Sequence, residues 1–208
     1  MWYLVLLAAI GSYLLGNLNG AVIISSIFAH DDVRSHGSGN AGLTNFIRNY
    51  GPRTALYVIL IDVGKAALAC FASGMLLAES GHYADGVALG GLGVILGHNF
   101  PALLGFKGGK GILSGVTVGL MMDWRIGLFV FGIFLVAYLL TKYVSLGSVL
   151  SSGSFGFIYA WLHPDRLFPI LVGLFLSGLI VWMHRANILR LIKGEERKTD
   201  FFSKGNKS

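Results

Sequence analysis

Charged residues are scarce in this chain. Only 12% of its 208 residues are Asp, Glu, Lys or Arg, whereas 54% are hydrophobic and the mean hydropathy is +0.69. A soluble globular domain carries roughly 25% charged residues, so the composition excludes that class. It predicts an all-α polytopic integral membrane protein, because helices satisfy their own backbone hydrogen bonds inside a bilayer.

Cysteine is also almost lacking. Cys70 is the only one and lies in an apolar run, which excludes a disulfide framework or a cysteine metal site within the chain. No histidine pair has the spacing of metal ligands either. We therefore expect no metal and no cofactor. The first residues lack the positive n-region of a signal peptide, so we interpret them as a retained first span.

Long apolar runs, in contrast, are abundant. A bilayer core is crossed by about 20 apolar residues in a helix, and the thirty glycines, several at GxxxG spacing, favour close packing of such helices. We predict a single membrane domain over residues 1–208, with residues 198–208 as a flexible basic tail. The seven transmembrane helices are predicted at 2–28, 54–78, 85–104, 111–123, 126–141, 146–162 and 167–184.

The cations are unevenly distributed between the two sides that seven spans create. Segments 29–53, 105–110, 142–145 and the part from 185 onward carry thirteen Lys and Arg, whereas the loops on the other side carry only Arg125 and Arg166. Positive loops stay in the cytoplasm. The N-terminus is therefore predicted outside and the C-terminus in the cytoplasm. Contact with anionic lipid alone would explain the most distal lysines.

A first polar cluster, SHGSGNAGLTNFIRNYG, occupies residues 35–51. Backbone amides between Ser38 and Gly42 form a plausible nest for an anion, and Arg48 offers a guanidinium that can hold phosphate with two hydrogen bonds. The alternative is an interfacial helix capped by Thr44 or Asn45. From the residues alone, neither interpretation is favoured.

A second cluster, GHNFPALLGFKGGKG, occupies residues 97–111. The Gly108–Gly109 amides, the Lys110 ammonium and the start of the next helix are predicted to bind phosphate. It is not a Walker A loop, because Leu104 stands where that pattern needs glycine. His98 either orients the loop through a backbone hydrogen bond or has a chemical role.

Two further polar clusters lie on the same predicted side. In KYVSLGS, Ser145 is interpreted as an N-cap and Ser148 as within reach of a substrate. In HRANILRLIKGEE, the residues His184, Asn187 and Arg190 are spaced by three and share one helix face. A lipid-surface helix explains only the apolar residues of that segment. Within the second span, Asp62 and Lys65 form an intramembrane pair that is either functional or structural.

These clusters resemble the motifs of one family, the bacterial acyl-phosphate-dependent glycerol-3-phosphate acyltransferases. The resemblance covers nearly the whole chain and departs only at apolar positions, namely Leu43, Ala66 and Leu103. It implies transfer of an acyl group from acyl phosphate to the sn-1 hydroxyl of glycerol 3-phosphate, giving lysophosphatidic acid and phosphate. The matching segments are SGNAGLTNFIR at 38–48, GHNFP at 97–101 with FKGGKG at 106–111, and RANILR at 185–190 with Gly194 and Glu196.

The resemblance also implies a site and a location. The expected partners are glycerol 3-phosphate, acyl phosphate and membrane lipids, without nucleic acid, at the cytoplasmic face of the bacterial inner membrane. The catalytic candidates are Ser38, Arg48, His184, Asn187 and Glu196. The substrate-binding candidates are Asn40, Thr44, Asn45, Lys107, Gly108, Gly109, Lys110, Ser148 and Arg190.

Two other functions remain as alternatives at this point. An organic-phosphate transporter would suit seven spans and an anion site, but inverted repeats and polar groups through the bilayer are not visible. A lipid-binding scaffold would not need clusters rich in Asn, Ser and His. For the enzyme, no His is followed five residues later by Asp. We therefore expect the hydroxyl proton to go to His184 or to a substrate phosphate oxygen.

Overall fold

The computed structural model describes residues 2–198, and within them it contains helices and loops without a strand. The predicted all-α class is therefore confirmed, whereas the predicted tail lies outside the described residues except for Lys198. Two short 3₁₀ helices, at Val33–Ser35 and Ala102–Leu104, lie in the loops. The α-helices are α1 Trp2–Gly16, α2 Gly20–Ala29, α3 Leu43–Tyr50, α4 Ala55–Ala78, α5 Tyr83–Asn99, α6 Ile112–Met122, α7 Trp124–Thr141, α8 Val144–Leu162, α9 Leu167–Met183 and α10 Arg185–Ile192.

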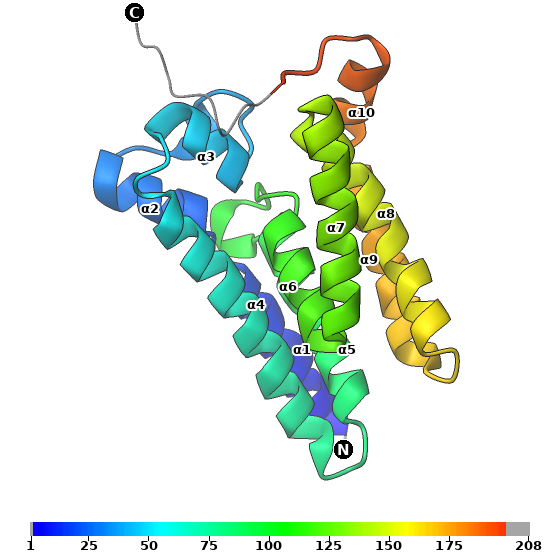
Figure 1. Ribbon diagram of the computed structural model, residues 1–208. Coiled ribbons are helices and arrows are strands. Elements are labelled where there is room, and N and C mark those ends of the chain that lie inside the picture. The colour runs from blue at the N-terminus through cyan, green and yellow to red at the C-terminus, as the bar shows by residue number, and fades with distance from the viewer. Residues whose placement is uncertain (1, 199–208) are drawn as a thin grey trace, which may run out of the picture.

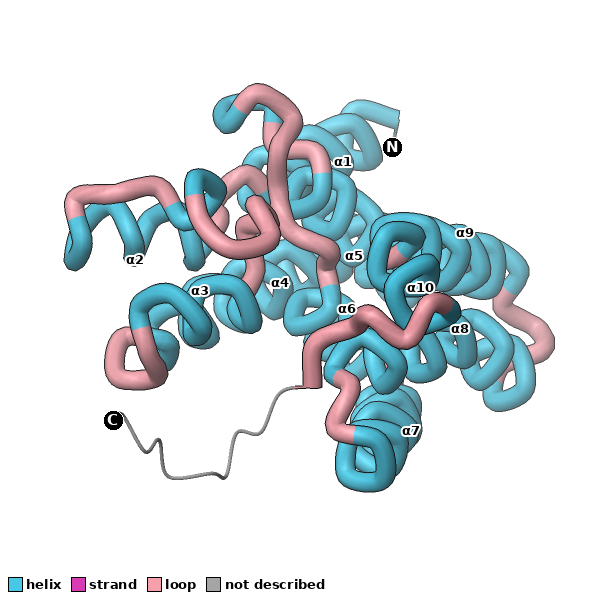
Figure 2. Tube along the Cα trace, turned by 90° about the horizontal axis from the view of Figure 1, so that it is seen from above, coloured by secondary structure: helices cyan, strands magenta, loops and turns pink. Residues whose placement is uncertain are grey.

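The long helices run side by side and leave the polar segments at one end. Figure 1 shows α3 and α10 at the upper end, whereas α1 begins at the lower end. Seen from above, α1, α4 and α5 form one group, α7, α8 and α9 form another, and α6 lies between them (Figure 2). The helices of each group pack on one another, and α6 contacts both α4 and α7.

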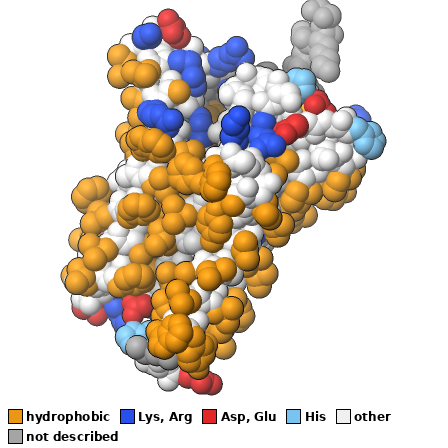
Figure 3. All heavy atoms as spheres, turned by 180° about the vertical axis from the view of Figure 1, so that it is seen from behind, with side chains coloured by type: hydrophobic (Ala, Val, Ile, Leu, Met, Phe, Trp, Pro, Cys, Tyr) orange, Lys and Arg blue, Asp and Glu red, His pale blue; other side chains and the backbone are white. Residues whose placement is uncertain are grey.

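The surface has the pattern of a membrane protein. Hydrophobic side chains cover the middle of the face in Figure 3, and Lys and Arg gather towards the end that holds the polar loops. Four segments are long and apolar enough to span a bilayer: Trp2–Ala29, Ala55–Ala78, Tyr83–Leu104 and Trp124–Thr141. A fifth is counted if α9 and α10, bent by 57°, form one span. The protein is thus multi-pass, and the number seven stays a prediction.

The span predicted over residues 2–28 corresponds to the apolar segment Trp2–Ala29, but this segment consists of two helices, α1 and α2. The chain breaks between Gly16 and Gly20, where Asn19 caps α2 by accepting a hydrogen bond from the Val22 amide at 3.1 Å. Asparagine competes for backbone hydrogen bonds in this way and interrupts helices. The carbonyls left by the break are satisfied by a lysine from α4, because Lys65 Nζ donates to Leu18 O at 2.6 Å and to Gly16 O at 3.3 Å.

Glycine brings α1 unusually close to α5. A Cβ added to Gly16 would lie 2.7 Å from the Cα of Gly97, so any side chain there would force the helices apart. This close approach agrees with the helix-packing interpretation of the GxxxG pairs. It places the end of α1, and the break that follows, directly beside the end of α5 and its polar loop.

Candidate active site

A polar cavity of about 430 Å³ opens among α3, α6, α7, α8 and α10. Its wall combines charged, hydroxyl and amide side chains with apolar ones. Eleven of the fourteen predicted site residues line it: Ser38, Asn40, Thr44, Asn45, Arg48, Lys110, Ser148, His184, Asn187, Arg190 and Glu196. The structure thus brings together residues from four clusters that are up to 158 positions apart in the chain.

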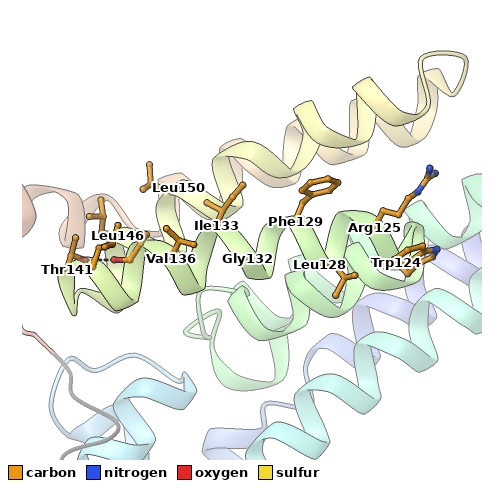
Figure 4. A pocket seen from close by; sticks show the side chains of 12 residues that line it. Trp124, Arg125, Leu128, Phe129, Gly132, Ile133, Val136, Thr141, Leu146 and Leu150 are labelled. Atoms are coloured by element: carbon orange, nitrogen blue, oxygen red, sulfur yellow. Dashed lines mark hydrogen bonds between the residues drawn. The ribbon is translucent and has the colours of Figure 1, made fainter.

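A larger hollow of about 970 Å³ follows the outer side of α7. Figure 4 shows its lining along the whole of α7, with Leu146 and Leu150 of α8 beside it. Arg125 at one end is held by Asp123, at 2.6 Å. The rest of the lining is almost wholly apolar and offers no group for chemistry, so the polar cavity is the candidate active site.

The segment after α9 forms a chain of hydrogen bonds across one side of the cavity. Lys110 donates to the Asn187 side-chain oxygen. The Asn187 amide donates to one Glu196 oxygen at 3.0 Å, and Arg190 Nε donates to the other at 2.7 Å. The spacing of three thus does place Asn187 and Arg190 on one face, and Glu196 fixes their orientation.

The charged side chains of this hydrogen-bond network shift one another's pKa values. Burial raises the pKa of Glu196, but hydrogen bonds from Asn187 and Arg190 outweigh it and leave the pKa below its usual value. Burial and the positive charges of Arg190 and Arg48 lower the pKa of Lys110, against the attraction of Glu196, and together they bring it to about 8. Lys110 is therefore a cation that loses its charge just above neutral pH unless an anion binds.

This pKa predicts how binding of a phosphate monoester depends on pH. Such an ester is a dianion above pH ~6, whereas Lys110 loses its proton above about pH 8. We expect kcat/KM for the phosphorylated substrate, which reports the free enzyme, to fall by up to about tenfold per pH unit above that point. In Lys110→Arg the guanidinium stays charged, so the fall should disappear. Identical profiles of the wild type and this variant would contradict the assignment.

His184 stands at the bend between α9 and α10 with only 3% of its surface exposed. Its Nδ1 lies 2.8 Å from the carbonyl oxygen of Ile180. A carbonyl only accepts hydrogen bonds, so Nδ1 carries the hydrogen, and in the neutral imidazole Nε2 keeps a lone pair. His184 thus presents an acceptor at the cavity wall, which is the form that a general base requires.

Asn45 shapes the first polar loop from inside. Its amide nitrogen donates to the carbonyls of Val33, His36 and Asn40 at 3.0–3.1 Å, and its oxygen accepts from the Ser38 amide at 3.0 Å. Its donors are therefore used within the loop, and its predicted contact with a substrate remains a prediction.

The two backbone interpretations of this loop need correction. Neither Thr44 nor Asn45 is an N-cap, because α3 begins at Leu43 with Gly42 as its cap and no side-chain cap bond. The anion nest is also largely closed: the amide of Gly39 donates to His36 O at 3.0 Å and that of Ala41 to Gly108 O at 3.4 Å. What the loop presents to the cavity is its side chains.

The glycine-rich loop is held by the same kind of bonds. The amide of Gly109 donates to the carbonyl of His98 at 3.0 Å, so the amide predicted to bind phosphate already has an acceptor. Arg34 holds the preceding turn through the carbonyls of Leu104, at 2.8 Å, and Lys107, at 3.2 Å. Lys107, Gly108 and Gly109 do not line the cavity, whereas Lys110 and Gly111 do.

A buried ionic cluster lies beneath this loop. Lys65 Nζ is 2.8 Å from Asp62 Oδ1 and 2.9 Å from His98 Nδ1, and all three residues are at most 5% exposed. Asp62 and His98 line the cavity. The sequence pointed to the Asp62–Lys65 pair but not to its contact with His98, because that contact joins two helices.

Two serines of α8 complete this side. Ser145 was interpreted as an N-cap, but α8 begins at Val144 with Tyr143 as its cap residue. Ser145 instead lies near Glu196, where its hydroxyl helps to lower the pKa of that carboxyl. Ser148 donates its hydroxyl to Val144 O of the helix at 2.9 Å, and both serines line the cavity.

Comparison with known proteins shows to which family the chain belongs. The model of the family described as "Glycerol-3-phosphate acyltransferase" matches residues 6–194. The chain belongs to the glycerol-3-phosphate acyltransferase family. Curated members include one from Prochlorococcus marinus (strain MIT 9215), 38% identical over 93% of this chain and 96% of that protein. Another, from Clostridioides difficile (strain 630), is 38% identical over 93% of this chain and 94% of that protein.

Solved structures of this acyltransferase family agree. PlsY (YgiH), described as an integral membrane glycerol 3-phosphate acyltransferase, superposes in its glycerol 3-phosphate form with a TM-score of 0.84 and 29% identity, covering 94% of this chain and 96% of that one. Its lysophosphatidic acid form gives a TM-score of 0.81 at 28% identity, covering 94% and 95%. The protein is therefore an enzyme of the bacterial membrane, an acyltransferase, and the transporter and scaffold alternatives are set aside.

Proposed function

We propose that this acyltransferase takes its acyl group from an acyl phosphate and transfers it to the sn-1 hydroxyl of glycerol 3-phosphate. The products are 1-acylglycerol 3-phosphate, which is lysophosphatidic acid, and inorganic phosphate. The observation that carries the proposal is one cavity that joins a cluster of cations to an apolar wall. A relative of the same fold has been solved in a glycerol 3-phosphate form and in a lysophosphatidic acid form.

The cationic side of the cavity suits two phosphates. Lys110, Arg48 and Arg190 line it from three separate segments, and Arg48 and Arg190 lower the pKa of Lys110 by repulsion. A bound anion relieves this repulsion, so the charges favour occupied states. Ser38, Asn40, Thr44 and Ser148 add hydrogen-bonding side chains to the same wall. Holding two anionic substrates in one cationic cavity supplies proximity and offsets their mutual repulsion.

The apolar side of the cavity suits a fatty chain. It is formed by residues of α6 and α7. An acyl chain bound there would keep its phosphate at the polar end, next to the cations. The apolar residues of this wall are Ile112, Leu113, Val116, Phe131 and Phe134.

The proposed chemical step needs one base and no protein nucleophile. The sn-1 oxygen attacks the acyl carbonyl carbon, a C–O bond forms, and the bond to the phosphate oxygen breaks. The hydroxyl proton passes to His184 Nε2, whose lone pair is fixed by the bond between Nδ1 and Ile180, and then to the departing phosphate. Glu196 keeps Asn187 and Arg190 in place during the step. Arg48, Ser38 and Lys110 stabilise the negative charge that develops.

We further propose seven spans, with the N-terminus outside and the cavity facing the cytoplasm. The support is the distribution of cations along the sequence, thirteen in the segments predicted to be cytoplasmic and two in the loops predicted on the other side. Because Cys70 is buried, single cysteines can be placed on a Cys70→Ala background. A membrane-impermeant maleimide added to intact cells should label Arg166→Cys and spare Lys193→Cys. Labelling of Lys193→Cys but not of Arg166→Cys would show that the topology is the opposite of the proposed one.

The reaction is tested with purified protein in detergent and labelled glycerol 3-phosphate. Palmitoyl phosphate, palmitoyl-CoA and palmitoyl-acyl carrier protein are supplied in separate reactions. We expect labelled lysophosphatidic acid with palmitoyl phosphate alone, together with an equal amount of inorganic phosphate. An equal yield of product with palmitoyl-CoA would contradict acyl phosphate as the specific donor. Absence of product with all three donors would contradict the proposed acyl transfer itself. Digestion of the product with a lipase specific for the sn-1 ester reports the position of the acyl group.

A further inference from the structure

The buried imidazole of His98 faces two different environments. On one side, Nδ1 lies 2.9 Å from the ammonium of Lys65. On the other, Nε2 lies against the glycine-rich loop, so close to Gly109 that an added Cβ there would collide with it. The residue is 4% exposed and lines the polar cavity. Its role therefore depends on which nitrogen carries the hydrogen.

Lys65 settles that choice. Its ammonium is a donor only, and it is surrounded by Asp62 Oδ1 at 2.8 Å, the carbonyls of Leu18 and Gly16, and His98 Nδ1. A hydrogen on Nδ1 would point at the ammonium, and the nearest Asp62 oxygen, at 3.7 Å, is too far to accept it. Nδ1 must therefore accept, and the hydrogen lies on Nε2.

The Nε2 hydrogen is thus a donor beside the loop that carries Lys110. Among residues 2–198, no group accepts a hydrogen bond from His98 Nε2. Nε2 is also not among the fully buried polar atoms that lack a partner, so it is accessible at the cavity that His98 lines, and a group that enters the cavity can accept from it. The surrounding cations select an anionic acceptor, because Lys110, Arg48 and Arg190 line the same cavity.

We propose that His98 is a substrate-binding residue that donates its Nε2 hydrogen to a phosphate oxygen of a bound substrate, with Lys65 and Asp62 as the positioning residues that fix this tautomer. The inference rests on the proposed function of the cavity and adds a neutral donor to its cations. It also assigns opposite hydrogen-bonding roles to two histidines that line the polar cavity. His184 presents a lone pair and His98 presents a hydrogen, and in each case the other nitrogen sets the choice.

Two variants separate this role from a structural one. In His98→Asn the side-chain oxygen can take the place of Nδ1 and still accept from Lys65, but no donor remains at the position of Nε2. In His98→Gln the longer side chain returns an amide donor to that position. Asparagine is one methylene smaller than glutamine, so thermal unfolding is measured for both variants to separate the loss of packing from the loss of the donor.

The test measures KM for glycerol 3-phosphate and for palmitoyl phosphate separately, together with kcat and thermal unfolding in detergent. We expect His98→Asn to raise one of the two KM values by roughly 10-fold to 100-fold, the range for a hydrogen bond to a charged group. His98→Gln should recover most of this loss. The substrate whose KM changes is the one that His98 contacts.

Several outcomes would overturn the inference. Both KM values could stay within threefold of the wild type in His98→Asn, or the two variants could lose activity equally and in proportion to a loss of folded protein. Neither result would touch the proposed reaction, which fails only if the wild-type enzyme makes no lysophosphatidic acid. Titration of the purified proteins with glycerol 3-phosphate alone, followed by calorimetry, gives the same comparison without turnover.

Discussion

His184→Asn should lower kcat by about 10²-fold to 10⁴-fold, the usual contribution of a general base. The asparagine amide can replace Nδ1 as the donor to Ile180 O, so the bend between α9 and α10 keeps its hydrogen bond. What disappears is the Nε2 lone pair. We therefore expect KM for glycerol 3-phosphate and the thermal unfolding midpoint to change little. Single-turnover rates of lysophosphatidic acid formation measure the effect directly.

His30→Asn provides the matched control. His30 is exposed and ends α2 in the left-handed region, at φ 51°, a conformation that asparagine tolerates well. This control should retain full activity. If kcat of His184→Asn, and of His184→Gln, stays within threefold of the wild type with an unchanged pH profile, then His184 is not the base. The proton would then go directly to a substrate phosphate oxygen.

Lys65→Met should destabilise the protein by about 3–5 kcal/mol, the cost of leaving one member of a buried ion pair alone. Asp62 is 2% exposed and has Lys65 as its cationic partner at 2.8 Å. The variant also removes the donor that satisfies Leu18 O at the break between α1 and α2. The free energy of unfolding, from denaturant titration in detergent, is the quantity to compare.

The double variant Asp62→Asn with Lys65→Met separates the charge from the packing. An asparagine at 62 keeps an oxygen for the amide of Gly20, which Asp62 now accepts at 3.2 Å. Without a buried charge, the double variant should be more stable than Lys65→Met alone. If it is no more stable, or if Lys65→Met unfolds like the wild type, then the pair does not carry the energetic role given to it here.

Hydrophobic runs located the long helices well because a membrane helix must be apolar over most of its length. The same signal failed between Gly16 and Gly20, since two asparagines barely change the average of a 28-residue apolar segment. The break depends on Lys65, which is 47 residues from Leu18 and reaches it only in the folded bundle. The contact between Lys65 and Leu18 could therefore not be predicted from the spacing of residues in the sequence.

The sequence predicted the polar residues of the site better than its apolar residues and its backbone hydrogen bonds. Polar residues in an apolar chain stand out, and eleven of them do line one cavity. Phe131 and Phe134 were missed, because an apolar residue that faces a cavity and one that faces lipid look alike in the sequence. Gly109 was expected to offer its amide to phosphate, but hydrogen bonds such as that to His98 O are settled by tertiary structure.

The position of Glu196 after the last long helix has a consequence for biosynthesis. A growing chain that has reached the end of α9 already contains every long apolar helix, yet it lacks Asn187, Arg190 and the carboxylate that orients them. Membrane insertion and catalytic competence are therefore separate events. A chain that ends in α10 would be embedded in the bilayer without the carboxylate that orients Asn187 and Arg190, and we expect it to be inactive.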